Sequence, residues 1–460
     1  MFVNRKRELK LLGDAYHDQG AGFYIIYGRR RVGKTELVLN FLKDKPHLYY
    51  MGDQRSEQEQ TETVKLLLAE YFHDEFIKSI GMRSWDSVFS YLAGKDFGDR
   101  KFILALDEFP YIAENSPSVA SVLQKYWDLG LKNKNLFIIL TGSSVSFMEK
   151  ELLSYKSPLY GRRTGQMEVR PFTLFEAAEL FPGADHEKVF DFYSVAGGIP
   201  AYLTKFDSNK SLKENLLKCV LKNDAFLYGE VNFLLMQELR TPRYYMAALR
   251  AISLGATKLN DIKNLTGFDR QMLGKYLETL YELRIIKRIF PAFENPLKSR
   301  KGLYVIQDNY FRFWFRFINP WLTLIEENRP GMILKVIEEG FQIYRGFIFE
   351  DVCRDFIRIN SGISGFENDF IGSWWNGKAE IDIVCTGLNG EIAVGECKFT
   401  NSKTGINILE DLEKRASLMT QKKIAKYLLF SGSGFTEELL NLKERREDLE
   451  LISFNEMFSY

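Results

Sequence analysis

The chain has little of what zinc, disulfide and membrane proteins depend on. Its 460 residues include four cysteines and four histidines. The cysteines form no C-x-x-C pair and the histidines are not paired, so we expect reduced thiols and neither a zinc nor a histidine metal site. No apolar stretch approaches about 18 residues without a charge, and the first residues lack the apolar core of a signal peptide. We therefore expect a soluble, cytoplasmic protein that does not cross a membrane.

The chain also has no excess of positive or negative charge. The chain has 62 basic and 61 acidic residues, a formal net charge of +1. Any surface for nucleic acid must therefore be local rather than global. With 45% hydrophobic and 27% charged residues the composition is that of a globular protein. At roughly 150 residues per domain, the length suggests about three domains.

The strongest motif lies near the start of the chain. An apolar run over residues 23–27 leads into a loop, and residues 36–42, starting with Glu36, have the pattern of a helix. This strand–loop–helix setting is the one in which G-x-x-x-x-G-K-[ST] binds phosphates, through backbone amides and the helix N-terminus. We expect Lys34 to reach the β- and γ-phosphates of ATP and Thr35 to hold Mg²⁺. The loop residues are Gly28, Arg29, Arg30, Arg31, Val32, Gly33, Lys34 and Thr35.

Two later apolar runs end in polar residues. The run over 101–106 ends in Asp107 and Glu108. We expect Asp107 to support Mg²⁺ and Glu108 to polarise the attacking water. The run over 135–140 ends in a Thr-Gly-Ser-Ser turn. There Ser143, or alternatively Ser144, is the candidate sensor of the γ-phosphate, and a helix cap is the other interpretation.

Two arginines follow on a loop flanked by glycines. Arg162 and Arg163 come after the sensor strand. Arginines in this place can meet phosphate charge within one chain or in a neighbouring copy, and a basic surface turn is the alternative. The sequence leaves open whether the chain forms a homo-oligomer.

Together these motifs resemble the ATPase family found predominantly in Archaea, in the STAND-like branch of the AAA+ superfamily. The resemblance covers about residues 1–205 and includes Val-Ala-Gly-Gly-Ile-Pro-Ala-Tyr-Leu over 195–203, which is similar to a phrase of that family's small helical subdomain. It implies an α/β fold with a parallel sheet flanked by helices, a helical lid, and conformational switching by ATP. The site residues that it implies are Lys34, Thr35, Asp107 and Glu108, and also Ser143 and Arg162 or Arg163.

The middle of the chain has a helical pattern and then changes character. Residues 206–238 carry an amphipathic stripe and are expected to be a helical connector. Residues 239–310 predict a winged helix, because three helices, with a glycine turn before the third, precede two β-rich runs. The helices are expected over 243–254, 257–265 and 270–283.

This winged-helix segment is locally basic. Residues 240–302 hold thirteen basic against five acidic residues, a local net charge of +8. Such a surface favours contact with the phosphates of DNA, although winged helices also bind proteins. The candidate DNA contacts are Arg270, Lys275, Lys298, Arg300 and Lys301.

An aromatic segment separates this region from the C-terminal part. Residues 311–340 are expected to be a helical linker, and Phe-Arg-Phe-Trp-Phe-Arg-Phe-Ile fills 311–318. The rings can serve as a stacking platform for bases. A core seam between domains is the preferred interpretation.

A second chemical site is expected in residues 341–460. Glu350 lies in an amphipathic helix pattern, and a strand over 374–384 carries Asp382. A turn leads to a returning strand that carries Glu396 and Lys398 on one face, so a hairpin can bring the three side chains together. Two carboxylates can bind Mg²⁺, which polarises a phosphodiester and activates water, and the lysine can stabilise developing charge.

This arrangement resembles the PD-(D/E)xK nuclease superfamily over about residues 341–435. The resemblance implies a restriction-endonuclease-like α/β domain that cleaves DNA, with Glu350 as the helix acid, Asp382 as the metal-binding aspartate and Glu396-x-Lys398 as the hallmark pair. Glu380 matches an additional acid. The sequence departs from the pattern in two places: no proline precedes Asp382, and Arg415-Ala416 and Gln421 only loosely replace a Gln-x-x-x-Ala phrase. A half-buried hairpin with an ion pair, or an inactive fold that only binds DNA, are the alternatives.

The sequence thus predicts an ATPase whose nucleotide state controls DNA binding and magnesium-dependent cleavage. An ATP-gated switch with an inactive nuclease fold is the second hypothesis. A scaffold in which ATP only promotes oligomerisation is the third.

Overall fold

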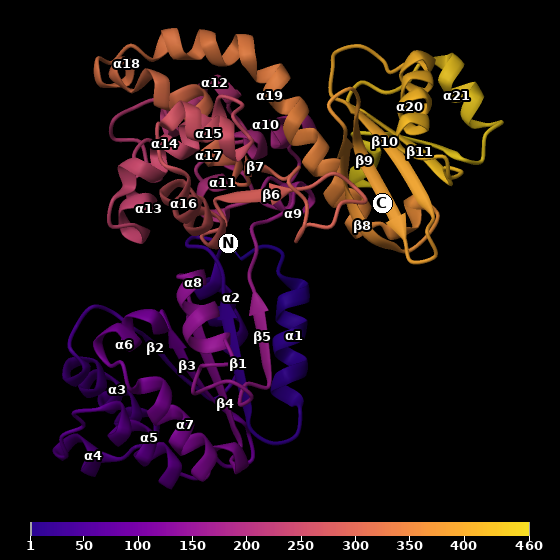
Figure 1. Ribbon diagram of the computed structural model, residues 1–460. Coiled ribbons are helices and arrows are strands. Elements are labelled where there is room, and N and C mark those ends of the chain that lie inside the picture. The colour runs from indigo at the N-terminus through magenta and orange to yellow at the C-terminus, as the bar shows by residue number, and fades with distance from the viewer. Residues whose placement is uncertain (1, 460) are drawn as a thin grey trace. The chain divides into compact units, whose positions relative to one another are not determined.

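The computed structural model describes residues 2–459, and the chain divides into two compact units. The N-terminal unit comprises the residues up to Pro171 together with Ile199–Ala201. The C-terminal unit comprises Phe172–Gly198 and the residues from Tyr202 onward. Each unit has its own sheet (Figure 1).

The N-terminal unit is built on a five-stranded sheet in which every paired strand is parallel. Every residue of β1, β3 and β4 is buried, as expected for central strands covered by helices on both faces. The parallel sheet predicted from the sequence is confirmed. In sheet order the strands are β2 (His47–Met51), β3 (Phe102–Asp107), β4 (Leu136–Gly142), β1 (Gly22–Tyr27) and β5 (Gly165–Glu168).

The helices of this unit connect the strands, and the polar residues predicted to be functional lie where strands end. The phosphate loop follows β1, Asp107 ends β3, and Ser143 follows β4. Carboxyl ends of parallel strands share one edge, which is where such sheets bind ligands. The helices are α1 (Lys6–His17), α2 (Lys34–Leu42), α3 (Glu57–Tyr71), α4 (Glu75–Ser79), α5 (Trp85–Gly94), α6 (Phe109–Asn115), α7 (Val119–Leu129) and α8 (Val145–Phe147).

Short helices open the C-terminal unit and lead to three helices followed by a two-stranded antiparallel ribbon, in the order predicted for 239–310. Gly267, at φ 71°, ends the second of these helices, and Asp269 caps the third by accepting from the amides of Gln271 and Met272. The elements are α9 (Leu174–Ala178), α10 (His186–Ala196), α11 (Pro200–Leu203), α12 (Leu212–Cys219), α13 (Glu230–Glu238), α14 (Pro242–Ser253), α15 (Leu259–Thr266), α16 (Arg270–Glu282), β6 (Ile286–Ile289) and β7 (Leu303–Ile306).

The aromatic segment is core. Phe311, Phe313, Phe315 and Phe317 are at most 2% exposed, so the stacking-platform interpretation is wrong and the rings belong to the core of the C-terminal unit. The segment forms α17 (Asn309–Phe313), a π-helical stretch over Trp314–Ile318, and α18 (Leu322–Glu326). The next helix, α19 (Pro330–Ile359), runs without a break across the boundary expected near residue 340.

A second five-stranded sheet forms the end of the chain. Strands β8 to β10 are antiparallel neighbours, whereas β10, β11 and β12 run parallel. The last strand extends this sheet, as expected. In sheet order the strands are β12 (Leu449–Ser453), β11 (Lys426–Ser431), β10 (Ile392–Lys398), β9 (Glu380–Gly387) and β8 (Asn368–Trp375), with helices α20 (Ile406–Met419) and α21 (Glu437–Lys443).

One predicted strand of this sheet is wrong. Residues 374–384 do not form a continuous strand, because β8 ends at Trp375 and β9 begins at Glu380. Between them the Asn376 side chain accepts hydrogen bonds from the amides of Lys378 and Ala379, both at 3.0 Å. Such side-chain-to-backbone bonds are typical of an Asx turn, which reverses the chain here. Asp382 is therefore the third residue of a fresh strand.

Contacts inside the C-terminal unit join its helical part to its sheet. The ring of Phe190 in α10 lies 4.7 Å from that of Phe399 and 5.4 Å from that of Phe454. The backbone amide of Ala292, just after β6, donates to the carbonyl of Ser373 in β8 at 2.8 Å. Between Phe2 and Ser459 no helix is both long and apolar enough to span a membrane.

Candidate nucleotide and phosphodiester sites

The loop after β1 has backbone conformations that only glycine adopts without strain. Gly28 has φ 151° and Gly33 has φ 91°. A Cβ at Gly28 would lie 2.3 Å from the carbonyl oxygen of Val169, so the chain must pass there without a side chain. Lys34 is buried, and its ammonium donates to the carbonyls of Gly28 at 2.9 Å and Arg29 at 3.0 Å. The Lys34 side chain therefore folds back over the phosphate loop and is hydrogen-bonded to its backbone.

Asp107 lies at the edge formed by the carboxyl ends of the strands in the N-terminal unit, and its carboxylate accepts four hydrogen bonds there. It is fully buried at the end of β3. Its Oδ2 accepts from the hydroxyl of Thr35 at 2.7 Å and from that of Tyr49 at 2.8 Å. Its Oδ1 accepts from the amide of Glu108 at 2.9 Å and from the hydroxyl of Thr141. The structure therefore brings together Thr35 and Asp107, the two residues predicted to hold Mg²⁺.

Glu108 is hydrogen-bonded to the candidate γ-phosphate sensor, Ser143. It adopts left-handed backbone angles, φ 49° and ψ 46°, which are strained for a residue with a side chain. Its Oε2 accepts from the Ser143 hydroxyl at 2.8 Å and from the Ser143 amide at 3.2 Å. The geometry thus links Glu108 to Ser143, the preferred of the two serines, while Ser144 precedes α8.

Tyr49 and Thr141 were missed by sequence reasoning. Tyr49 belongs to β2, a strand that no motif marks, and it faces Asp107 because its register partner Ala105 lies two residues earlier on β3. Burial, and next the charge of Asp107, raise the pKa of the Tyr49 hydroxyl far above its ordinary value. Thr141 belongs to the Thr-Gly-Ser-Ser segment, of which only the serines were considered as candidates. For both residues, the register of the strand relative to β3 is what would have shown that the side chain faces Asp107.

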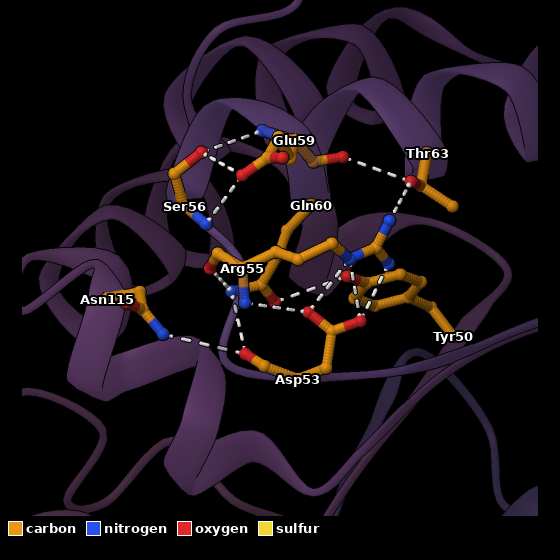
Figure 2. Close-up of polar contacts among 8 residues, drawn as sticks. All are labelled: Tyr50, Asp53, Arg55, Ser56, Glu59, Gln60, Thr63 and Asn115. Carbon is orange, nitrogen blue, oxygen red and sulfur yellow. Dashed lines mark hydrogen bonds and ion pairs between the residues drawn. The ribbon is translucent and has the colours of Figure 1, made fainter.

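A polar network fixes the loop that follows β2 (Figure 2). The Arg55 side chain donates to both carboxylate oxygens of Asp53, at 3.0 and 2.8 Å. The Gln60 amide donates to the carbonyl oxygens of Asp53 and Arg55, and Ser56 forms a capping box with Glu59. The amide of Gly52 donates to the carbonyl of Asp107 at 2.8 Å. The end of β2 is therefore tied to the end of β3.

The predicted arginines do not all lie at this edge of the sheet. The Arg30 guanidinium donates to the hydroxyl of Tyr111 on α6 at 2.9 Å, and Arg31 has φ 68°. Arg162 forms an ion pair with Asp128 at 2.8 Å, which lowers the pKa of that carboxyl. The guanidinium of Arg163 lies 5.6 Å from the centroid of the Tyr160 ring. Both arginines precede β5, whose first residue, Gly165, pairs with Tyr24 near the start of β1. They therefore lie at the edge of the sheet opposite the phosphate loop, which follows the end of β1.

A buried arginine near the start of the chain supports the loop and was also missed. Arg5 is 3% exposed. It donates to the carbonyl of Val32 in the loop at 2.9 Å and to that of Arg170 at 2.8 Å. Arg170 directly precedes Pro171, where the first segment of the N-terminal unit ends. The phosphate loop is thus directly connected to the segment through which the chain leaves this unit.

In the C-terminal unit the predicted hallmark residues meet at one end of β9 and β10. Gly395 pairs with Ile383, so the next residues on the two strands, Glu396 and Asp382, are opposite each other. Asp382 accepts from the amide of Cys397 at 3.0 Å. The Lys398 ammonium lies 2.6 Å from Glu396 Oε1, and Arg415 of α20 lies 2.9 Å from Glu396 Oε2. Arg415, expected only as a loose substitute, is thus a direct partner of the site.

Glu350 lies within electrostatic range of this group. Burial, and next the charge of Asp382, raise the pKa of Glu350. Burial, and next the charge of Glu396, raise the pKa of Asp382. Arg354 moderates both, because its guanidinium donates to the carbonyl of Asp382 at 2.8 Å and lies 3.6 Å from Glu350. Two neighbouring carboxyls therefore hold protons more tightly than exposed ones.

The side chains of this cluster do not form a ready metal cage. Between Phe2 and Ser459, no three His, Cys, Asp or Glu side chains are arranged to hold a metal ion. Glu380, the additional acid, is exposed, and its backbone carbonyl accepts from Arg415 at 2.7 Å. An ion here would depend on the facing pair Asp382 and Glu396, with waters and substrate oxygens as the other ligands, as is usual for Mg²⁺.

The candidate DNA contacts are exposed. Arg270 opens α16 and Lys275 lies one turn further on the same helix. Lys298, Arg300 and Lys301 lie in the loop between β6 and β7, where Lys301 forms an ion pair with Glu294 at 2.6 Å. The residues are accessible, as a phosphate-binding surface requires.

Comparison with known proteins now adds to this geometry. Residues 2–206 match the family described as an ATPase domain predominantly from Archaea. An uncharacterized protein of Methanocaldococcus jannaschii is 35% identical over 441 residues, covering 94% of this chain and 95% of that protein. The chain belongs to this archaeal ATPase family. An uncharacterized ATP-binding protein of the same organism is 53% identical over 45 residues, 10% of this chain and 76% of that protein.

Two further matches concern the C-terminal part and the fold. Residues 314–415 match a family described as archaeal and bacterial proteins of unknown function. Among solved structures, the Walker-type ATPase of Pyrococcus abyssi is 22% identical, with a TM-score of 0.49 over 68% of this chain and 96% of that one. The family match over residues 2–206 identifies the N-terminal unit of this protein as a P-loop ATPase domain.

The residues present fit a nucleotide with magnesium. The loop of the ATPase is free of a side chain at Gly28, and no side chain caps the N-terminus of α2, whose first amides are those that bind phosphate in P-loop proteins. Lys34 and Thr35 are the first two residues of α2, and the Thr35 hydroxyl is already joined to Asp107. Hydroxyl and carboxylate oxygens are the ligand types that Mg²⁺ prefers.

Proposed function

We propose that this ATPase uses its nucleotide state to control DNA binding and magnesium-dependent cleavage of a phosphodiester in the C-terminal unit. Lys34 would bind the phosphates, Thr35 and Asp107 would hold the magnesium ion, and Glu108 would polarise the attacking water. Ser143, hydrogen-bonded to Glu108 at 2.8 Å, would orient that carboxylate. Arg162 and Arg163 lie at the opposite edge of the sheet, so we propose them only for the phosphates of a nucleotide in a neighbouring copy, which for Arg162 requires release from Asp128.

One observation carries the cleavage part of the proposal. Asp382 and Glu396 face each other across β9 and β10, and Lys398 lies 2.6 Å from Glu396. A magnesium ion held by the two carboxylates would polarise the phosphodiester and lower the pKa of a bound water. Lys398 would stabilise charge on the substrate, and Glu350, with its raised pKa, would hold or accept a proton beside Asp382.

The DNA part is supported by the elements of residues 239–310. Three helices followed by an antiparallel ribbon are the elements of a winged helix, and its third helix is the one that enters the major groove in that class. Arg270 and Lys275 on α16 are exposed, as are Lys298, Arg300 and Lys301 in the loop that would form the wing. We propose these five cations as the phosphate contacts.

The control of DNA by ATP is supported by the exit segment of the N-terminal unit. Arg5 joins the carbonyl of Val32 in the phosphate loop to that of Arg170, and the carbonyl of Val169 lies against Gly28. A change in the loop on nucleotide binding would therefore reach residues 169–170. From there the chain continues into the C-terminal unit.

A second function is favoured by a specific contact. Glu396 is 4% exposed and carries ion pairs with both Lys398 and Arg415. Two cations on one carboxylate offset the charge that a metal ion would need. This arrangement favours an ATP-gated switch that binds DNA without cutting it.

Nicking assays separate the two functions. Purified wild type and Asp382→Asn would be incubated with linear and branched DNA, with Mg²⁺ or Mn²⁺, and with or without ATP. We expect cleavage by the wild type, and a loss of at least about hundredfold in Asp382→Asn with unchanged ATP hydrolysis. Glu391→Gln, in the turn between β9 and β10, is the matched control and should cut normally. Tight ATP-dependent DNA binding without cleavage by the wild type would favour the switch.

A further inference from the structure

The carboxylate of Asp107 has no acceptor site to spare. A carboxylate offers about four lone-pair positions. Four donors meet it here: Thr35 and Tyr49 at Oδ2, and Thr141 and the Glu108 amide at Oδ1. Since Asp107 is fully buried, water does not supply further partners. Any additional donor at this carboxylate must displace one of the four.

Three of the donors have reasons to stay. The Glu108 amide is backbone, and Thr141 belongs to buried β4, where its hydroxyl also accepts from the Glu108 amide at 3.3 Å. The Thr35 hydroxyl has one hydrogen and two lone pairs, so its oxygen can bind a cation while its hydrogen still points to Asp107. Tyr49 is the remaining donor, and like Thr35 it is only partly buried. Unlike Thr35, it is not a proposed metal ligand, so it is the donor that can leave Oδ2 of Asp107.

The position of Tyr49 is nonetheless built into the fold. β2 pairs with β3 in register from His47 to Met51, and the amide of Gly52 donates to the carbonyl of Asp107. The network of Asp53, Arg55 and Gln60 then holds the loop beyond it (Figure 2). The fold therefore holds the Tyr49 hydroxyl next to Oδ2 of Asp107, and the hydroxyl binds this oxygen whenever no other donor does.

We infer that Tyr49 is a positioning residue that competes with the water shell of magnesium for Oδ2 of Asp107. Mg²⁺ sheds its waters reluctantly and usually keeps several of them in protein sites. Such waters donate to nearby carboxylates, and Tyr49 occupies the place where one would bind. The phenol thereby raises the magnesium concentration needed for tight nucleotide binding and stabilises the metal-free state. The inference rests on the proposed assignment of Thr35 and Asp107 as the magnesium site.

Binding of a fluorescent ATP analogue by the full chain tests this role without depending on turnover. Affinity would be measured against Mg²⁺ concentration and in EDTA, for wild type, Tyr49→Phe and Tyr50→Phe. We expect Tyr49→Phe to lower the half-saturating Mg²⁺ concentration by about tenfold, since a hydrogen bond to a charged group is removed from the metal-free state only. Affinity in EDTA should be unchanged. Tyr50, whose hydroxyl lies 3.2 Å from Gln60 Oε1 rather than at Asp107, is the matched control.

Two further measurements make the outcome decisive. Tyr49→Phe should lower the Tm of the metal-free protein, because a buried carboxylate loses a donor, and Mg²⁺ with nucleotide should abolish that difference. An unchanged or higher Mg²⁺ requirement in Tyr49→Phe would overturn the competition. A wild-type Mg²⁺ requirement in Thr35→Ala would instead overturn the underlying metal-site assignment, so the two failures are distinguishable.

Discussion

The two carboxylate sites of this protein are held by different kinds of partner. At the N-terminal site Asp107 accepts hydrogen bonds from three hydroxyls and one backbone amide, all of them neutral. At the C-terminal site Glu396 is held by two cations, Lys398 at 2.6 Å and Arg415 at 2.9 Å. Both carboxylates are buried, so each needs partners, but the choice of partner differs.

The difference bears on how each site meets a metal ion. Neutral donors satisfy the oxygens of a carboxylate and leave its negative charge to attract a cation. Cationic partners offset that charge internally, so a metal ion must compete with them. At the proposed N-terminal site magnesium would therefore meet an uncompensated negative charge, and only the neutral hydroxyl of Tyr49 would have to leave Asp107. The proposed C-terminal site would require the release of a cation, or a substrate that draws Lys398 or Arg415 away.

The largest effect is expected at the N-terminal site. Glu108→Gln keeps the shape of the side chain but removes the negative charge that would polarise water. We expect ATP turnover to fall by about 10²–10⁴-fold, while the fluorescent analogue still binds. Steady-state hydrolysis and binding would be measured on the same preparation. Glu114→Gln, an exposed acid on helix α6, which begins directly after Glu108, is the control. Normal hydrolysis by Glu108→Gln would show that Glu108 is not the residue that polarises the water.

The sequence revealed the parts of both sites that lie in contiguous motifs. The glycine loop, Asp107 with Glu108, and Glu396 with Lys398 each stand at the end of a recognisable strand, so spacing alone placed them. Tyr49 was missed, and Arg415 was predicted only as a loose motif match, because their contacts depend on strand register and on how a helix packs over a sheet. A one-residue shift of β2 would turn Tyr49 to the other face. Long-range contacts of this kind leave no mark in a local pattern.

Removing one cation from Glu396 should make the second site resemble the first. In Arg415→Gln, Oε2 of Glu396 loses its ion pair and becomes available to a metal ion. We expect Mn²⁺ to bind the C-terminal site several-fold more tightly, about 3–10-fold, at a cost in thermal stability. Titration calorimetry in a Thr35→Ala background would isolate this site from the N-terminal one.

The neighbouring lysine provides the control for that experiment. Lys414 is exposed on the same helix and pairs with Asp411 rather than with Glu396. Lys414→Gln should therefore leave Mn²⁺ affinity unchanged. Equal Mn²⁺ affinities in wild type and Arg415→Gln would mean that the ion pair with Arg415 does not hinder metal binding at Glu396. The difference in partners between Glu396 and Asp107 would then not affect metal binding.

The last prediction concerns pH and tests proton binding at the C-terminal site. The folded protein holds a proton on Glu350 more tightly than the unfolded chain does, because burial and the charge of Asp382 raise its pKa. Above the ordinary carboxyl range, the native state therefore binds more protons than the unfolded state, and stability falls as pH rises toward the raised pKa. One such group contributes a slope of at most about 1.4 kcal/mol per pH unit.

Replacing Glu350 by glutamine should flatten this slope. Glutamine is neutral at every pH, so Glu350→Gln should gain stability relative to wild type as pH rises from about 5 to about 8, with little difference at the acidic end. Thermal unfolding of both proteins across this range measures the effect, with Glu339→Gln, an exposed acid on the same helix α19, as the control. Asp382, whose pKa is also raised, would keep part of the slope in the variant. Parallel pH profiles for wild type and Glu350→Gln would mean that Glu350 is ionised in the folded protein, which would remove it as a proton carrier at the C-terminal site.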